Sequence, residues 1–159
     1  MSNYLLEAIK QLNRLCEGKQ TLIGYHGSPK KFNKFELDKV DSGHGDGGMY
    51  GPGIYFTEDP ELAKIWNEHG YLYKCKLTFD NPYVVNNGDT EDIQELIKSD
   101  YKNNRNYNDM TDFFNQGYDS VVSNNETWED PTGKNPPEKH NQYVAFKPEQ
   151  IQILSVEKY

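Results

Sequence analysis

The stretch Tyr50-Gly51-Pro52-Gly53-Ile54-Tyr55-Phe56-Thr57 joins a glycine-containing turn to a short aromatic strand. Two other short segments, far apart in the chain, also have strand character: Tyr25-His26-Gly27-Ser28 and Asn141-Gln142-Tyr143-Val144-Ala145-Phe146. The segment Asp41–Gly53 holds six glycines and predicts a loop without regular structure. The sequence therefore predicts three short strands, far apart in the chain, and a glycine-rich loop before the second of them.

Composition narrows the class of protein. The 159 residues are enough for one domain with a real core, and the formal net charge of −8 argues against non-specific binding to a nucleic-acid backbone. No apolar run is long enough to span a bilayer, and no signal peptide is evident. Two scattered cysteines and four histidines give no zinc pattern. We expect a protein of the cytoplasm, with no membrane contact and no metal.

Hydrophobic periodicity predicts the other elements. An amphipathic helix is expected over 3–17, within an N-terminal segment 1–20 that precedes a single globular domain, 21–159. Strands are expected at Thr21–His26, Gly53–Phe56, Tyr71–Phe79, Tyr118–Val122, Gln142–Phe146 and Ile151–Val156. Helices are expected from Pro60 to about Glu68, with Asp59 as N-cap, and over Glu91–Ser99 and Met110–Gln116. The polar, proline-containing stretch Asn124–Asn141 predicts a long loop. This mixed order favours an α+β fold.

His26-Gly27-Ser28 at the end of a strand has two interpretations. Gly27 has no side chain, so a planar ligand such as a carboxamide can approach its backbone N–H and C=O. Alternatively, His26 simply caps a strand end beside an ordinary turn.

The aromatic residues Tyr55 and Trp66 also allow two interpretations. They stand on a strand and on the following helix, where they can face each other across a gap. Stacking on both faces of a flat cationic ring contributes ~1 to 2 kcal/mol for each contact when desolvated. The alternative is that the two rings pack on each other in the core.

In their order along the chain, these segments resemble the His–Tyr–Glu core of ADP-ribosyltransferases related to diphtheria toxin and the poly(ADP-ribose) polymerases. The later segments Asn81-Pro82-Tyr83, Gly117-Tyr118-Asp119 and Gln142–Ile151 also resemble the small ADP-ribosyltransferase domains of phages and mobile elements. His26-Gly27-Ser28 matches the first core strand of the family, and Gly51–Phe56 matches its Gly-x-Gly-Ile-Tyr-Phe strand. Trp66 matches the second aromatic residue, usually Tyr, at the same distance from Tyr55. The resemblance covers about Leu22 to Leu154.

The resemblance implies an ADP-ribosyltransferase-like fold with two small angled β-sheets, flanking helices and an NAD cleft between the sheets. It implies that His26 binds the adenosine ribose and that Gly27 holds the nicotinamide carboxamide. Ser28 and Gly53 would complete the cofactor site, and Tyr55 and Trp66 would sandwich the ring. Asp41–Tyr50 would be the donor loop. Within Asn124–Asn141, Trp128, Glu138 and the Pro136-Pro137 turn are candidates for acceptor contact, although Trp128 is equally compatible with packing on its own loop.

Gln142 stands where this family most often has its catalytic Glu. The transition state resembles an oxocarbenium ion, and a carboxylate stabilises the charge that develops on the sugar. Glutamine keeps the hydrogen-bonding oxygen but loses the charge, at a cost of ~3 to 4 kcal/mol. Three hypotheses remain: an engineered Glu-to-Gln variant, which we prefer, a natural degenerate binder, or a substitute carboxylate, with Glu138 and Glu149 nearest in sequence.

The sequence therefore predicts an NAD-dependent mono-ADP-ribosyltransferase, a bacterial or phage toxin or host-modifying effector, with Gln142 inactivating this form. Its catalytic residues would be His26, Tyr55 and Gln142. The acceptor would be a macromolecule, protein being favoured over RNA or DNA, and an antitoxin-like partner for the N-terminal helix is an open alternative. Rival hypotheses are a catalytically dead NAD-binding or partner-binding module, an NAD-glycohydrolase, and an unrelated interaction protein.

Overall fold

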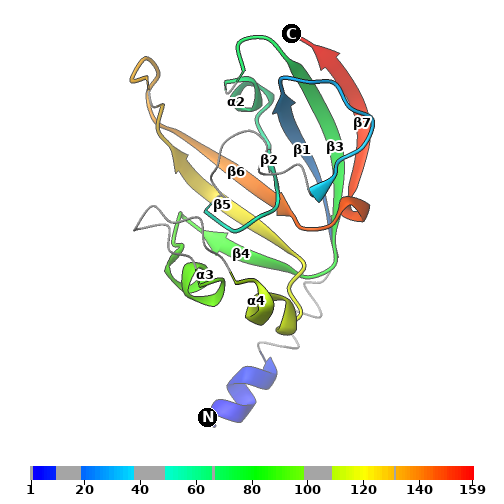
Figure 1. The fold of residues 1–159 in the computed structure, drawn as a ribbon. Helices are drawn as coiled ribbons and strands as arrows, with labels where there is room; N and C mark the ends of the chain where they lie inside the picture. Colours follow the sequence, from blue (N-terminus) through cyan, green and yellow to red (C-terminus); the bar gives the residue numbers. More distant parts are fainter. Residues whose placement is uncertain (1, 10–18, 38–48, 66, 99–108, 131) are drawn as a thin grey trace.

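The computed structural model describes residues 2–9, 19–37, 49–65, 67–98, 109–130 and 132–159. Within these ranges a single mixed sheet has the strand order β4-β5-β6-β2-β1-β3-β7 (Figure 1). The strands are β1 (Gln20–Ser28), β2 (Ile54–Thr57), β3 (Tyr71–Phe79), β4 (Pro82–Asn86), β5 (Ser120–Trp128), β6 (Glu138–Ala145) and β7 (Ile151–Lys158). The helices are α2 (Pro60–Lys64), α3 (Glu91–Leu96), α4 (Thr111–Asn115) and the 3-10 helix η3 (Pro148–Gln150). β4 and β5 are parallel, and the other neighbouring pairs are antiparallel.

The two small sheets implied by the resemblance are parts of this one sheet. Strands β1 and β2 share a single register pair, Tyr25 with Thr57, whereas β1 is paired with β3 along its full length. The parts β4-β5-β6-β2 and β1-β3-β7 therefore join at one point. Figure 1 shows β5 and β6 running at an angle to β1, β3 and β7. A short junction lets the two parts twist apart while the hydrogen-bonded ladder stays continuous.

An inner core lies between the two parts of the sheet. Its buried members come from the loop before β2 and from β2, β3, β5 and β6: Phe35, Ile54, Phe56, Tyr73, Cys75, Leu77, Phe79, Val122, Tyr143 and Ala145. Because residues from both parts of the sheet belong to one contacting cluster, the sheet bends around this core. Burial of each large apolar side chain contributes ~1.5 to 3 kcal/mol.

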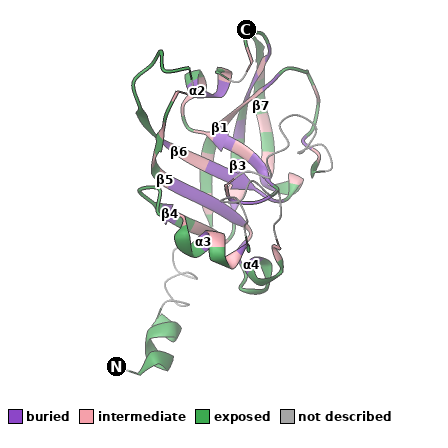
Figure 2. Cartoon of the chain, turned by 60° about the vertical axis from the view of Figure 1, so that its left-hand side comes forward, coloured by how far each residue is buried: buried purple, intermediate pink, exposed green. Residues whose placement is uncertain are grey.

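A second, outer core lies on the opposite face of the β4-β5-β6-β2 part, beside α3 and α4. Its members are Tyr50, Val85, Ile93, Ile97, Phe113, Tyr118, Val121, Val144 and Phe146. Successive residues of β6 alternate between the cores, since Tyr143 and Ala145 belong to the inner one and Val144 to the outer one. Figure 2 shows this central part of the sheet buried. Ser120–Ser123 of β5 and Tyr143–Ala145 of β6 are therefore covered on both faces.

Several predicted elements are confirmed. β3 has the predicted bounds, and its odd-numbered face, Tyr73 to Phe79, is buried. Asp59 caps α2 by accepting a hydrogen bond from the Glu61 backbone N–H at 2.9 Å. The three helices lie where the periodicity predicts them, although α2 ends at Lys64 instead of about Glu68.

One strand was not predicted, and one expectation for the remaining strands is wrong. β4 was not predicted, because Pro82 suggested only the end of β3; a proline is tolerated there since it begins an edge strand. The stretch Asn124–Asn141 is not one long loop, because its two ends extend β5 and β6 into a hairpin. The outward polar side chains of this hairpin hide the strand periodicity. A register shift between Ser123 and Glu126 interrupts it further.

The N-terminal segment contributes a helix over residues 3–9, all exposed, and the rest of the predicted helix lies outside the described residues. Both views show this helical segment standing away from the sheet (Figures 1 and 2). Among the helices of the described ranges, none combines the length and apolar character required to cross a membrane.

Candidate active site

The three sequence segments meet where β1 and β2 diverge. Their ladder consists of the pair Tyr25 and Thr57, so a continued register would place Gly27 opposite Tyr55. Instead, Nδ1 of His26 lies 2.8 Å from the carbonyl oxygen of Tyr55. From His26 onward, β1 has register partners on β3 but none on β2. The edge of β1 that faces β2 is therefore open at the predicted carboxamide site.

The hydrogen bond between His26 and Tyr55 sets the state of the imidazole. A carbonyl oxygen can only accept, so Nδ1 carries the proton and Nε2 of the neutral ring offers a lone pair. Burial lowers the pKa of His26 from its usual 6.5, opposed in part by the bond to Tyr55. Phe35 packs edge-on at 5.2 Å between ring centroids, and Phe56 lies at 5.7 Å. His26 is thus a positioned, neutral hydrogen-bond acceptor near pH 7.

Tyr55 is held by its hydroxyl. This group donates to the Gly51 carbonyl oxygen at 2.7 Å and accepts from the Tyr50 backbone N–H at 3.1 Å. Burial raises the pKa of Tyr55, so the hydroxyl stays protonated and able to donate. These bonds fix the ring against the turn that precedes β2. The ring borders the outer core, whereas His26 packs against inner-core residues.

Glycine is required at position 27 because the backbone of α2 lies close to it. A Cβ atom at this position would collide with the carbonyl oxygen of Ala63 in α2. The bare face of Gly27 is therefore covered by protein, and only its strand edge is left for a ligand. This corrects the expectation that the missing side chain itself makes the room for a planar group.

Ser28 and Gly53 also have structural roles. The Ser28 hydroxyl donates to the Lys30 carbonyl at 2.9 Å and accepts from the Lys30 N–H at 3.2 Å, which closes the turn after β1. A Cβ atom on Gly53 would lie 2.8 Å from the Ala145 carbonyl oxygen, so this glycine lets the turn before β2 pack on β6. Both positions shape the site through the backbone.

Gln142 lies in the middle of the sheet on the same face as Tyr55. It is the register partner of Thr57 on β2 and of Ser123 on β5. Tyr55 precedes Thr57 by two residues, so its side chain projects from the same face of the sheet. Gln142 is half-buried, so part of the residue is accessible. The sheet therefore places residue 142 one strand away from Tyr55, next to the divergence of β1 and β2.

Comparison with known families identifies the class of protein. A family model described as ADP-ribosyltransferase in polyvalent proteins matches residues 17–158. The chain belongs to this ADP-ribosyltransferase family. A search of curated proteins finds no match. The matched region includes His26, Tyr55 and Gln142.

Two predicted parts of the ADP-ribosyltransferase site lie outside the described residues. They are Trp66 and most of the expected donor loop, residues 41–48. The end of that loop is described: Tyr50 is fully buried, and Gly51 has a φ of 98°, which favours glycine. The structure thus describes how the donor loop joins β2.

A carboxylate that the sequence motifs do not indicate lies beside Gln142. Glu126 Oε2 lies 3.0 Å from the Tyr50 hydroxyl and 2.9 Å from the Ser123 hydroxyl, both of which donate to it. The two hydroxyl oxygens are themselves 3.0 Å apart. No local motif marks this group, because only the pairing of β5 with β6 across the hairpin brings Glu126 near Gln142.

The predicted acceptor residues Trp128 and Glu138 are strand residues in the ADP-ribosyltransferase domain, which corrects their assignment to a loop. They face each other as the last register pair of the hairpin. Glu138 precedes Gln142 by four residues on an extended strand, or ~13 Å. It is exposed, as is Glu149 in η3. Neither carboxylate is placed to replace a Glu at position 142.

The hairpin tip between β5 and β6 is organised by Asp130. Its carboxylate accepts from the Thr132 N–H at 2.8 Å and hydroxyl at 2.7 Å, and from the Asn135 N–H at 3.0 Å. These bonds, those of Thr132 first, lower the pKa of Asp130 to about 2. The tip is therefore ordered by one side chain.

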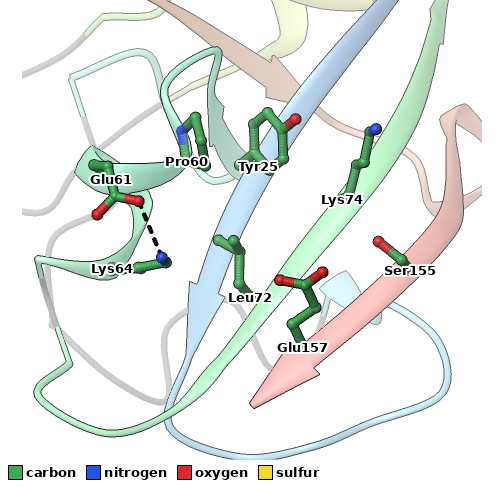
Figure 3. A pocket seen from close by; sticks show the side chains of 8 residues that line it. All are labelled: Tyr25, Pro60, Glu61, Lys64, Leu72, Lys74, Ser155 and Glu157. Atoms are coloured by element: carbon green, nitrogen blue, oxygen red, sulfur yellow. Dashed lines mark hydrogen bonds and ion pairs between the residues drawn. The ribbon is translucent and has the colours of Figure 1, made fainter. Parts of the chain in front are cut away.

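A separate cavity of about 300 Å³ lies beside α2 on β1, β3 and β7. Figure 3 shows its lining: Tyr25, Pro60, Glu61, Lys64, Leu72, Lys74, Ser155 and Glu157. Lys64 is bonded to Glu61 at 3.0 Å. None of the sequence-predicted site residues lines this cavity. The described ranges also hold no cluster of three or more His, Cys, Asp or Glu arranged for a metal ion.

Proposed function

We propose that this ADP-ribosyltransferase domain cleaves NAD and transfers a single ADP-ribose to a macromolecular acceptor. The C–N bond between ribose C1′ and nicotinamide breaks, and its electron pair neutralises the pyridinium ring as nicotinamide leaves. A lone pair of the acceptor then attacks C1′, and the acceptor group loses its proton. The protein's task is to bind, orient and stabilise the developing positive charge.

The observation that carries the proposal is the hydrogen bond from His26 Nδ1 to the Tyr55 carbonyl at 2.8 Å. It holds Nε2 as an acceptor for a ribose hydroxyl at the open edge of β1. In this arrangement the edge at Gly27 holds the carboxamide, and the Tyr55 ring packs on the nicotinamide, with Trp66 as its second face. Gln142, on the same sheet face as Tyr55, binds the nicotinamide-proximal ribose through its amide.

The acceptor is proposed to be a protein. The net charge of −8 disfavours a phosphate backbone. The hairpin tip at Asp130 projects beyond the sheet and offers a defined surface to an acceptor (Figure 1). A host-modifying effector role rests on the family resemblance alone.

The test uses NAD labelled in its ADP-ribose part, incubated with lysate and the wild-type chain, Gln142→Glu or His26→Ala. We expect label on protein from the wild-type chain, ~10² to 10³ times faster labelling by Gln142→Glu, and none from His26→Ala. Nicotinamide release with free ADP-ribose as the only labelled product would instead identify a glycohydrolase. Absence of NAD binding by both the wild-type chain and Gln142→Glu would refute the proposal.

A further inference from the structure

We propose that Glu126, on the strand next to Gln142, supplies the negative charge that the site lacks at position 142. This inference rests on the proposed function. It names the group on which turnover depends in a chain that has Gln at position 142. Glu126 takes part in no bond change. Its carboxylate stabilises the positive charge that develops on the ribose while the C–N bond breaks.

The register of the hairpin puts Glu126 beside Gln142. Ser123 is directly opposite Gln142, and Glu126 is directly opposite His140, two residues before Gln142. Partners in a ladder share one face of the sheet, so Glu126 and Gln142 are diagonal neighbours on the face that carries Tyr55. The register shift between Ser123 and Glu126 adds one residue to β5 and aims the Glu126 side chain back toward Ser123. Because of this irregularity, the carboxylate lies on the strand next to residue 142.

The hydrogen bonds of Glu126 leave it able to act on a ligand. The Tyr50 and Ser123 hydroxyls both donate to Oε2, at 3.0 and 2.9 Å. In the part of the chain that the structure describes, no hydrogen bond reaches Oε1. Glu126 is half-buried, where a charge is less screened than on an open surface. One oxygen is thus anchored, and the other has no hydrogen-bond partner among the described residues.

The charge of Glu126 acts on two nearby tyrosines, Tyr50 and Tyr55. Burial is the main cause of the raised pKa of Tyr55, and the charge of Glu126 raises it further. Tyr50, the last residue of the expected donor loop, has its pKa raised by burial, and Glu126 again adds to the effect. Tyr55 is a residue of the candidate site, so the charge of Glu126 acts on a group of that site.

Another carboxylate near position 142 is less suitable. Glu58 follows Thr57, but its two oxygens accept from the Asn141 N–H at 2.9 Å and from the Asn141 side-chain amide at 3.1 Å. Successive residues of a strand point to opposite faces, so Asn141 lies on the face of β6 opposite to Gln142. The bonds between Glu58 and Asn141 are therefore on that opposite face. Burial raises the pKa of Tyr143, an inner-core residue on that face, and the charge of Glu58 raises it further. Its two oxygens are thus used to bind β6 at the end of β2.

The experiment compares nicotinamide release and NAD affinity for the wild-type chain, Glu126→Gln, Gln142→Glu and the double variant. We expect Glu126→Gln to lower kcat ~10²-fold while the Kd for NAD changes less than ~3-fold, because the charge acts mainly on the transition state. The double variant should regain the wild-type rate or exceed it, since Gln142→Glu restores a carboxylate. Glu149→Gln, an exposed carboxylate away from the site, is the matched control and should leave kcat unchanged.

Two further variants separate charge from structure. Ser123→Ala removes one hydrogen bond but keeps the carboxylate, and it should lower kcat less than ~10-fold. Melting temperatures identify any variant that fails to fold, and Glu126→Asp, which keeps the charge, should retain more activity than Glu126→Gln. Equal kcat for the wild-type chain and Glu126→Gln would overturn the inference, as would turnover confined to Gln142→Glu. Failure of every variant to bind NAD would refute the proposed function itself.

Discussion

The carbonyl oxygen of Tyr55 accepts a hydrogen bond from Nδ1 of His26 at the point where β1 and β2 separate. This bond replaces the next rung of the strand ladder. It holds the two strands at a fixed distance while leaving the edge of β1 unpaired. It also leaves Nε2 of His26 as an acceptor, so a structural bond between two strands prepares a ligand contact.

The ring and the hydroxyl of Tyr55 should have separable roles. Tyr55→Phe removes the bonds to Tyr50 and Gly51, and we expect it to lower the free energy of unfolding by ~1 to 2 kcal/mol with NAD affinity changed less than ~3-fold. Tyr55→Ala also removes the stacking surface and should weaken NAD binding ~10-fold or more. Urea denaturation and calorimetric titration measure the two effects. A Tyr55→Phe variant that loses NAD affinity as strongly as Tyr55→Ala would contradict stacking as the main contact.

Stability should depend on pH through His26. Burial lowers its pKa in the folded state below the usual 6.5, so below pH 6.5 the unfolded chain binds a proton that the folded chain does not. The folded state therefore has its full stability above pH 6.5 and loses up to ~1.4 kcal/mol per pH unit as the pH falls from 6.5 toward the lowered value. Urea titrations at several pH values, for the wild-type chain and His26→Ala, measure this dependence. An identical pH dependence in both proteins would show that other groups cause it.

Gly27→Ala should destabilise the fold strongly. The added methyl group would meet the Ala63 carbonyl oxygen, which belongs to a backbone and cannot turn aside. We expect a loss of ~3 kcal/mol. The control is Gly88→Ala, where nothing lies within 4 Å and the φ of 71° is the source of a cost of ~1 kcal/mol. Thermal or urea unfolding compares them, and equal costs would argue against the close approach of α2 to β1.

The hairpin tip should affect the acceptor and not NAD cleavage. Asp130→Ala removes the bonds that order the tip, and we expect transfer to protein to fall ~10-fold while nicotinamide release stays within ~2-fold. Labelled NAD with lysate measures transfer, and chromatography of nicotinamide measures cleavage. If both rates fall together, the tip supports the NAD site and not the acceptor.

Much of the local structure follows from sequence. The alternation in Tyr71–Phe79 predicts β3 because one face of that strand contacts the core. Asp59 and Pro60 mark the start of α2 because a cap and a proline satisfy the first turn of any helix. The hairpin was missed because Asn124 and Asn125 are typical of loops, and their strand pairing depends on β6. Local signals thus predict elements whose burial or capping is itself local.

The sequence by itself determined which segments carry the ADP-ribosyltransferase motifs, since these depend on residue type and order. Only the tertiary structure decided how they meet. It joined two expected sheets at Tyr25 and Thr57, covered the bare face of Gly27 with α2, and brought Glu126 beside Gln142. Register across a sheet depends on contacts between distant segments, and a shift of one residue changes which side chains share a face. The position of charge in this site is therefore a property of the fold.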